Sequence, residues 1–173
     1  MIDIDYFSLF RLPNQFIIDV ELLKRSWISA ASIAHPDRYV GSSFAIEKIS
    51  SVQFSSYINK AYQTLKDPLL RAKYICERSG INFEIERTHL VSKAFLSKQL
   101  EWHDWIDECG NDFDKLCDLT SQLKKEITNI HDSLESLLDK KRNYKQAATK
   151  VCEWMFLEKL MKELDSIQSH RIF

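Results

Sequence analysis

Apolar side chains recur every three or four residues along most of this chain, which is the spacing of amphipathic helices. In the first half, the pattern predicts one or two helical turns at 6–10 and a helix of about fifteen residues that Pro36 ends. A longer helix is predicted over 44–66, and a fourth runs on to Gly80. Asp19 and Asp67 are the expected N-caps of two of these helices.

The second half has no proline, and it predicts three long helices. The first covers roughly 88–108, the second begins near Asn111 or Asp112, and the third begins at Asn143, where Gln146 completes a capping box. The second helix carries an apolar seam of Leu116, Leu119, Leu123, Ile127, Ile130, Leu134 and Leu137. Such a seam is typical of helices that pack nearly antiparallel in a bundle. We therefore expect an all-α chain with an N-terminal domain at 1–78, a junction at 79–86 and a C-terminal three-helix bundle at 87–173.

Composition and charge exclude several classes of function. With three glycines and three prolines in 173 residues, no glycine-rich phosphate loop can be written. The formal net charge of −1 argues against a non-specific nucleic-acid binder. The chain has no run of 18 apolar residues, and its acidic start lacks the features of a signal peptide. We expect a cytoplasmic protein, a monomer or weak dimer, that binds neither membrane nor nucleic acid.

Metal and enzyme chemistry find little support in the sequence. Four cysteines form no CxxC pair and are expected to be reduced and mostly buried, although a zinc site using Cys109 and Cys117 is an open alternative. The five histidines are scattered, without HExxH or catalytic-triad spacing. We expect no metal, no cofactor and no enzymatic activity of the chain's own.

The break at Pro36 belongs to the tripeptide His35-Pro36-Asp37, which lies between two predicted helices. Proline fixes φ and stiffens the loop, so His35 and Asp37 are held at its tip as a donor and acceptor pair. Taken alone, the tripeptide could be a simple turn in which Asp37 caps the next helix. Its context includes a Tyr-Phe-x-Leu-Phe-x-Leu-Pro run at 6–13 and an Asn-Lys-Ala-Tyr…Asp-Pro-x-x-Arg-Ala-x-Tyr run at 59–74.

Over residues 4–76 this arrangement resembles a J domain, the module by which co-chaperones activate the ATPase of DnaK-type chaperones. Later features resemble the HscB-type co-chaperones of iron–sulfur cluster assembly: the Leu-Leu-Arg-Ala run at 69–72, the Ala-Phe-Leu-x-x-Gln-Leu-Glu run at 94–101 and the Phe-Leu-x-Lys-Leu run at 156–160. The resemblance implies an L-shaped, two-domain protein. It also implies two partners, the chaperone HscA and the iron–sulfur scaffold IscU.

The resemblance assigns residues to each partner. The expected chaperone-binding residues are Lys24, Arg25, His35, Pro36, Asp37 and Arg38. Ala34 and Ser32 depart from the family, which often has tyrosine and a basic residue at these positions. The basic docking surface is therefore thinner than is usual in the family.

The expected scaffold-binding residues are Leu96, Ser97, Leu100, Glu101, Asp104, Glu108 and Phe156. Leu96, Leu100 and Asp104 are four residues apart and share one helix face. A second stripe, which includes Phe95, Trp102 and Ile106, is available to pack the bundle. Ser97 stands where the family has a larger apolar side chain, which should weaken the contact by about 1 kcal/mol. Two alternatives are open. Leu96 and Leu100 could be core residues that face the J domain, or the chain could be a J-domain adaptor for a different client, with the bundle as a tether or dimerisation module.

Overall fold

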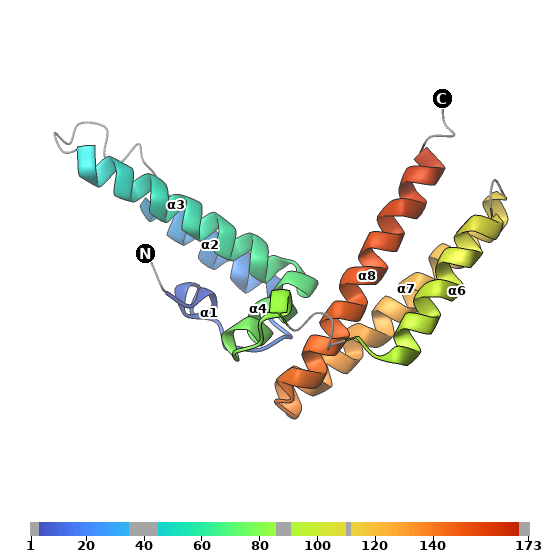
Figure 1. Cartoon of the computed structure of the whole chain (residues 1–173). Helices are drawn as coiled ribbons and strands as arrows, with labels where there is room; N and C mark the ends of the chain where they lie inside the picture. The colour runs from blue at the N-terminus through green and yellow to red at the C-terminus, as the bar shows by residue number, and fades with distance from the viewer. Residues whose placement is uncertain (1–3, 35–44, 86–90, 110–111, 170–173) are drawn as a thin grey trace. The chain divides into compact units, whose positions relative to one another are not determined.

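The computed structural model describes residues 4–34, 45–85, 91–109 and 112–169. All regular secondary structure in these ranges is helical, as the sequence predicts (Figure 1). The chain divides into two compact units, Met1–Ile75 and Cys76–Phe173. The division falls inside α4, and the junction at 79–86 stays a prediction.

The first unit is built on a pair of helices that lie side by side, α2 (Val20–Ala34) and α3 (Ala45–Lys66) (Figure 1). The short α1 (Tyr6–Leu9) precedes them, and α4 (Pro68–Arg78) follows. Both expected N-caps are confirmed. The Asp19 carboxylate accepts from the backbone N–H of Leu22, and Asp67 accepts from that of Leu70, each at 2.9 Å.

Aromatic side chains join the helices of the first unit. Trp27 of α2 stacks on Tyr62 of α3, with ring centroids 4.6 Å apart, and its indole N–H donates to Asn59 at 3.0 Å. Tyr6 stacks on Tyr74 of α4 at 4.4 Å. The fully buried residues of this core include Phe7, Phe10, Phe16, Leu23, Ile58 and Leu65. Leu23 of α2 is therefore buried together with Ile58 and Leu65 of α3, whereas Trp27 is half-buried at the edge of this core.

Gly80 follows the end of α4, where the sequence places a helix-terminating glycine. Its φ is +94°, in the left-handed region that favours glycine. Its N–H donates to the carbonyl of Glu77, and the N–H of Ile81 donates to the carbonyl of Cys76. This pair of bonds is the Schellman motif, which satisfies the last carbonyls of the helix.

The second unit contains α6 (Lys93–Cys109), α7 (Phe113–Glu135) and α8 (Tyr144–Ser169), which run alongside one another (Figure 1). The expected cap Asn143 is confirmed, since its side chain accepts from the N–H of Gln146. Helix α7 is capped by Asp112, one of the two residues near which it was expected to begin, and Asp112 accepts from the N–H groups of Asp114 and Lys115. The seam of α7 is buried as predicted, except that Ile127 is half-buried. Leu157, Leu160 and Leu164 of α8 complete the core.

Two details of the second unit differ from the sequence prediction. Helix α6 begins at Lys93 and not near 88, because the Ser92 hydroxyl accepts from the N–H of Phe95 and caps the helix there. Residues 86–90 lie outside the described residues. In addition, α7 does not end in an ordinary helical turn but continues into a π-helical turn, η2 (Ser136–Lys140).

Candidate partner-binding surfaces

The expected chaperone-binding surface is described only in part. His35, Pro36, Asp37 and Arg38 lie outside the described residues. Lys24 and Arg25 are exposed on α2, which ends at Ala34, directly before the tripeptide. The structure therefore positions the two basic residues and does not describe the loop itself.

The fold explains why the side chains of Lys24 and Arg25 are exposed. They follow Leu23, which is fully buried, and successive helical positions turn by about 100° around the axis. Two apolar residues that the sequence analysis did not single out, Ile28 and Ile33, are also exposed on α2. Ser32, which departs from the family pattern, donates its hydroxyl to the carbonyl of Ser29 at 2.8 Å. Its side chain is thus engaged within its own helix.

The expected scaffold-binding face on α6 is accessible in the structure. Leu100 exposes 67% of its surface and Leu96 exposes 47%, which are large fractions for leucine in a packed bundle. Phe95, Trp102 and Ile106 on the other side of α6 are buried and pack the bundle. Leu96 and Leu100 are therefore not part of the bundle core, and α6 has the two apolar stripes that its sequence predicts.

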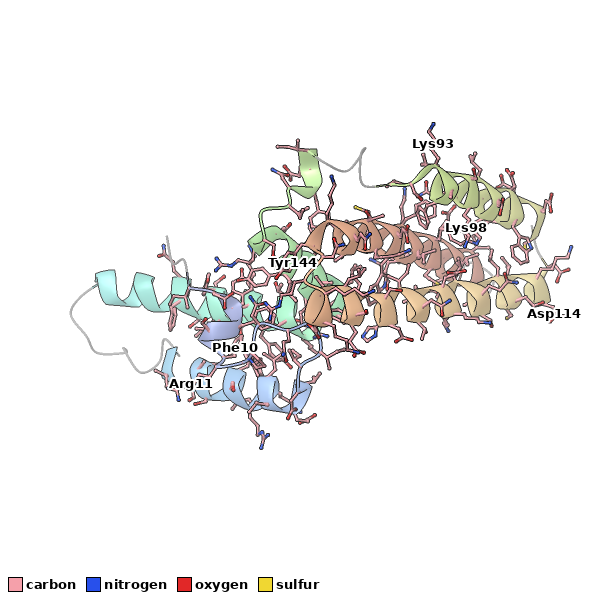
Figure 2. The ribbon with its side chains drawn as sticks, turned by 90° about the horizontal axis from the view of Figure 1, so that it is seen from below. Phe10, Arg11, Lys93, Lys98, Asp114 and Tyr144 are labelled. Carbon is pink, nitrogen blue, oxygen red and sulfur yellow. The ribbon has the colours of Figure 1, made fainter. Side chains whose placement is uncertain are left out.

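Polar residues surround the two leucines on α6. Ser97, Glu101, Asp104 and Glu108 are all exposed. Lys98 reaches across to α7, where its ammonium lies 3.5 Å from the carboxylate of Glu126 (Figure 2). The later turns of α6 therefore present an acidic face of Glu101, Asp104 and Glu108 beside the leucines.

Phe156 of α8 is half-buried and belongs to an aromatic cluster. Its ring centroid lies 5.8 Å from that of Phe95 and 6.2 Å from that of Trp102. A third neighbour is His103, whose ring meets Phe156 edge to face at 5.8 Å. The structure thus brings the predicted residue Phe156 next to α6, and it adds His103, which the sequence analysis did not select.

The cysteines are free thiols, and Cys76, Cys109 and Cys152 are buried, whereas Cys117 is half-buried. Burial raises the pKa of the Cys76 thiol to about 12, and the nearby Cys152 and Glu77 contribute to this rise to a smaller extent. In the described part of the chain, no three His, Cys, Asp or Glu side chains gather in a way that could hold a metal ion. Nor does any helix in the described ranges have the length and apolar character needed to cross a bilayer.

Comparison with known proteins gives consistent matches over nearly the whole chain. Residues 91–165 match the family described as the HSCB C-terminal oligomerisation domain. A relative from Bordetella petrii, a co-chaperone protein HscB homolog, is 41% identical over 160 residues, covering 92% of this chain and 94% of the relative. A homolog of the same description from Chromobacterium violaceum is 40% identical, with 95% and 94% covered.

Solved structures show the same architecture. The chaperone HscB from Vibrio cholerae superposes with a TM-score of 0.83 at 27% identity, covering 96% of this chain and 99% of that chain. The human co-chaperone protein HscB, at 21% identity, shares the fold with a TM-score of 0.87, covering 96% and 83%. The expected architecture, an N-terminal J domain followed by a C-terminal helical bundle, is confirmed. This chain belongs to the HscB family of co-chaperone proteins.

Proposed function

We propose that this protein activates ATP hydrolysis on a DnaK-type chaperone, HscA, and delivers the iron–sulfur scaffold IscU to it, promoting the maturation of iron–sulfur proteins. The protein catalyses no reaction itself and acts in the cytoplasm, where free thiols persist. The observation that carries the proposal is the pair of exposed leucines, Leu96 and Leu100, on a helix whose opposite face packs the bundle.

The J domain supplies the chaperone contact. Lys24 and Arg25 project from α2 and suit an acidic partner surface, towards which they steer the encounter. The tripeptide His35-Pro36-Asp37 follows α2 directly, and its proline limits the entropy lost when the loop docks. In this proposal His35 and Asp37 form hydrogen bonds with the chaperone, and Lys24 and Arg25 keep the J domain aligned on the chaperone surface.

The bundle supplies the scaffold contact. Leu96 and Leu100 offer apolar surface that gains free energy when a partner removes it from water. Glu101, Asp104 and Glu108 lie on the same side of α6 and favour a partner with basic groups at the rim of its apolar patch. Phe156 extends the apolar area from α6 to α8.

Calorimetric titration with purified IscU tests this surface. The wild-type protein is expected to bind, and a triple variant with Leu96→Ala, Leu100→Ala and Phe156→Ala is expected to lose binding. Leu70→Ala is the matched control, because Leu70 exposes 45% of its surface but lies on α4 of the first unit. Failure of the wild type to bind would refute the choice of partner. Equal binding by the triple variant would refute the choice of surface.

A second candidate function is favoured by one finding, the description of the matched family as an oligomerisation domain. In that case Leu96 and Leu100 would pair two copies of the bundle, and the J domain would serve a different client. Sedimentation velocity over a range of protein concentrations separates the two functions. The proposed function predicts a monomer or weak dimer whose sedimentation does not change in Leu100→Ala, whereas the alternative predicts a dimer that this substitution dissociates.

A further inference from the structure

His103 of α6 lies against Phe156 of α8. The two ring centroids are 5.8 Å apart, and the ring planes are inclined by 78°. This edge-to-face arrangement is one of the favoured geometries for aromatic pairs, which contribute stabilisation beyond the area they bury. The contact is thus a specific one between two helices of the bundle.

The neighbours of Phe156 differ in exposure. Phe95 and Trp102 are buried, and they contact the Phe156 ring from within the bundle. His103 is exposed, so the imidazole contacts Phe156 at the surface of the bundle. Phe156 is half-buried, and His103 is the exposed one of these three rings that contact it.

The register of α6 places His103 beside the leucines. Leu96, Leu100 and His103 are at positions i, i+4 and i+7, which form one continuous stripe on a helix. The imidazole therefore lies between the exposed leucines of α6 and the phenyl ring of α8. His103 lies on this stripe and contacts Phe156, so it links the apolar stripe of α6 to the ring on α8.

We propose that His103 is a positioning residue of the scaffold-binding surface, holding the Phe156 ring next to Leu96 and Leu100. This inference rests on the proposed function and adds to it a residue that the family resemblance did not assign. With the imidazole removed, the ring can leave its place, and a partner must then order it during binding, which lowers affinity.

The test is a calorimetric titration of His103→Ala with IscU. We expect the affinity to fall by about two- to tenfold, the change that corresponds to the stabilisation an edge-to-face aromatic pair contributes. His103→Phe keeps a ring at this position and is expected to bind within about twofold of the wild type. In a Phe156→Ala background, His103→Ala is expected to cause no further loss, because it acts through Phe156.

His131→Ala is the matched control. His131 of α7 meets Trp154 of α8 at 6.0 Å and 70°, nearly the same geometry at another place in the bundle. This variant should bind IscU as the wild type does. The proposal would be overturned if His103→Ala bound IscU with wild-type affinity, or if His131→Ala lost as much affinity as His103→Ala. It would also be overturned if His103→Ala lowered the affinity as much in the Phe156→Ala background as it does in the wild type.

A second readout needs no partner. In the free protein carrying ¹³C-labelled phenylalanine, the NMR signal of Phe156 should shift and report increased ring motion in His103→Ala but not in His131→Ala. An unchanged Phe156 signal would overturn the positioning role. A wild-type protein that fails to bind IscU would instead overturn the proposed function, and the NMR result would still show whether His103 fixes the ring.

Discussion

Leu100→Ala and Leu96→Ala should weaken scaffold binding by different amounts, and their order follows from the structure. Fully burying a leucine side chain is worth about 1.5–3 kcal/mol relative to full exposure. Leu100 has 67% of its surface left to bury and Leu96 has 47%. If a partner covers both completely, the gain is about 1–2 kcal/mol at Leu100 and about 0.7–1.4 kcal/mol at Leu96.

These energies correspond to measurable changes in affinity. Leu100→Ala should raise the dissociation constant for IscU by about five- to thirtyfold, and Leu96→Ala by about three- to tenfold. Titration calorimetry on the two single variants gives the comparison directly. An affinity loss larger at Leu96 than at Leu100, or no loss at either, would refute the argument from exposure.

The same two variants should leave the fold intact. Leu100 and Leu96 contribute little to the bundle core, so urea unfolding should give nearly the wild-type free energy of unfolding. Leu123→Ala provides the contrast: this leucine of α7 is fully buried, and the substitution should cost about 2–5 kcal/mol. A loss of stability in Leu100→Ala as large as that in Leu123→Ala would mean that Leu100 is a core residue.

Four further predictions concern the fold that carries these surfaces. Arg71→Met should cost about 1–3 kcal/mol in urea unfolding, because the buried guanidinium donates to the carbonyl of Leu65 at 2.6 Å and lies over the Phe16 ring; an unchanged midpoint would contradict this. Gly80→Ala should lower the free energy of unfolding by about 1 kcal/mol. This loss comes from the positive φ alone, since a Cβ at this position meets nothing within 4 Å. Cys76, with its pKa raised to about 12, should react with iodoacetamide more slowly than half-buried Cys117 at about pH 8, and equal rates would contradict its burial. Because a thiol in the unfolded chain ionises near 9.0, this group's contribution to stability should fall as the pH rises through that value, as urea unfolding at increasing pH would show.

Most helix boundaries could be predicted from local sequence because local chemistry determines them. Asp19, Asp67 and Asn143 each accept a backbone N–H in the turn that follows, as expected of N-caps. Gly80 could be placed at the end of α4 because a helix commonly ends on a residue with positive φ, and glycine adopts it without strain. The spacing of leucines along α7 likewise predicts which side of that helix is buried.

Other features depend on packing that local sequence does not contain. Helix α6 starts at Lys93 because Ser92 caps it. Several polar residues precede the helix, and the spacing of apolar residues does not predict which of them is the cap. The π-helical turn η2 has no signal in the apolar spacing. His103 was missed as a site residue because its contact with Phe156 joins two helices far apart in the chain, although its place at i+7 from Leu96 was a usable sign.

The sequence predicts the two candidate surfaces to different extents. Two apolar stripes on α6 predict that one of them faces away from the bundle, and the exposure of Leu96 and Leu100 agrees. The partner proposed for that stripe does not follow from its spacing, and it rests on the family resemblance. For the J domain, the sequence identified the tripeptide, and the structure adds the exposure of Lys24 and Arg25.

The rate of ATP hydrolysis by HscA, measured with and without this protein, tests the central claim most directly. The account predicts that the wild-type protein accelerates hydrolysis. His35→Gln should abolish that acceleration while binding IscU with wild-type affinity, because the two surfaces belong to separate units. Absence of acceleration by the wild type, or equal acceleration by His35→Gln, would contradict the account.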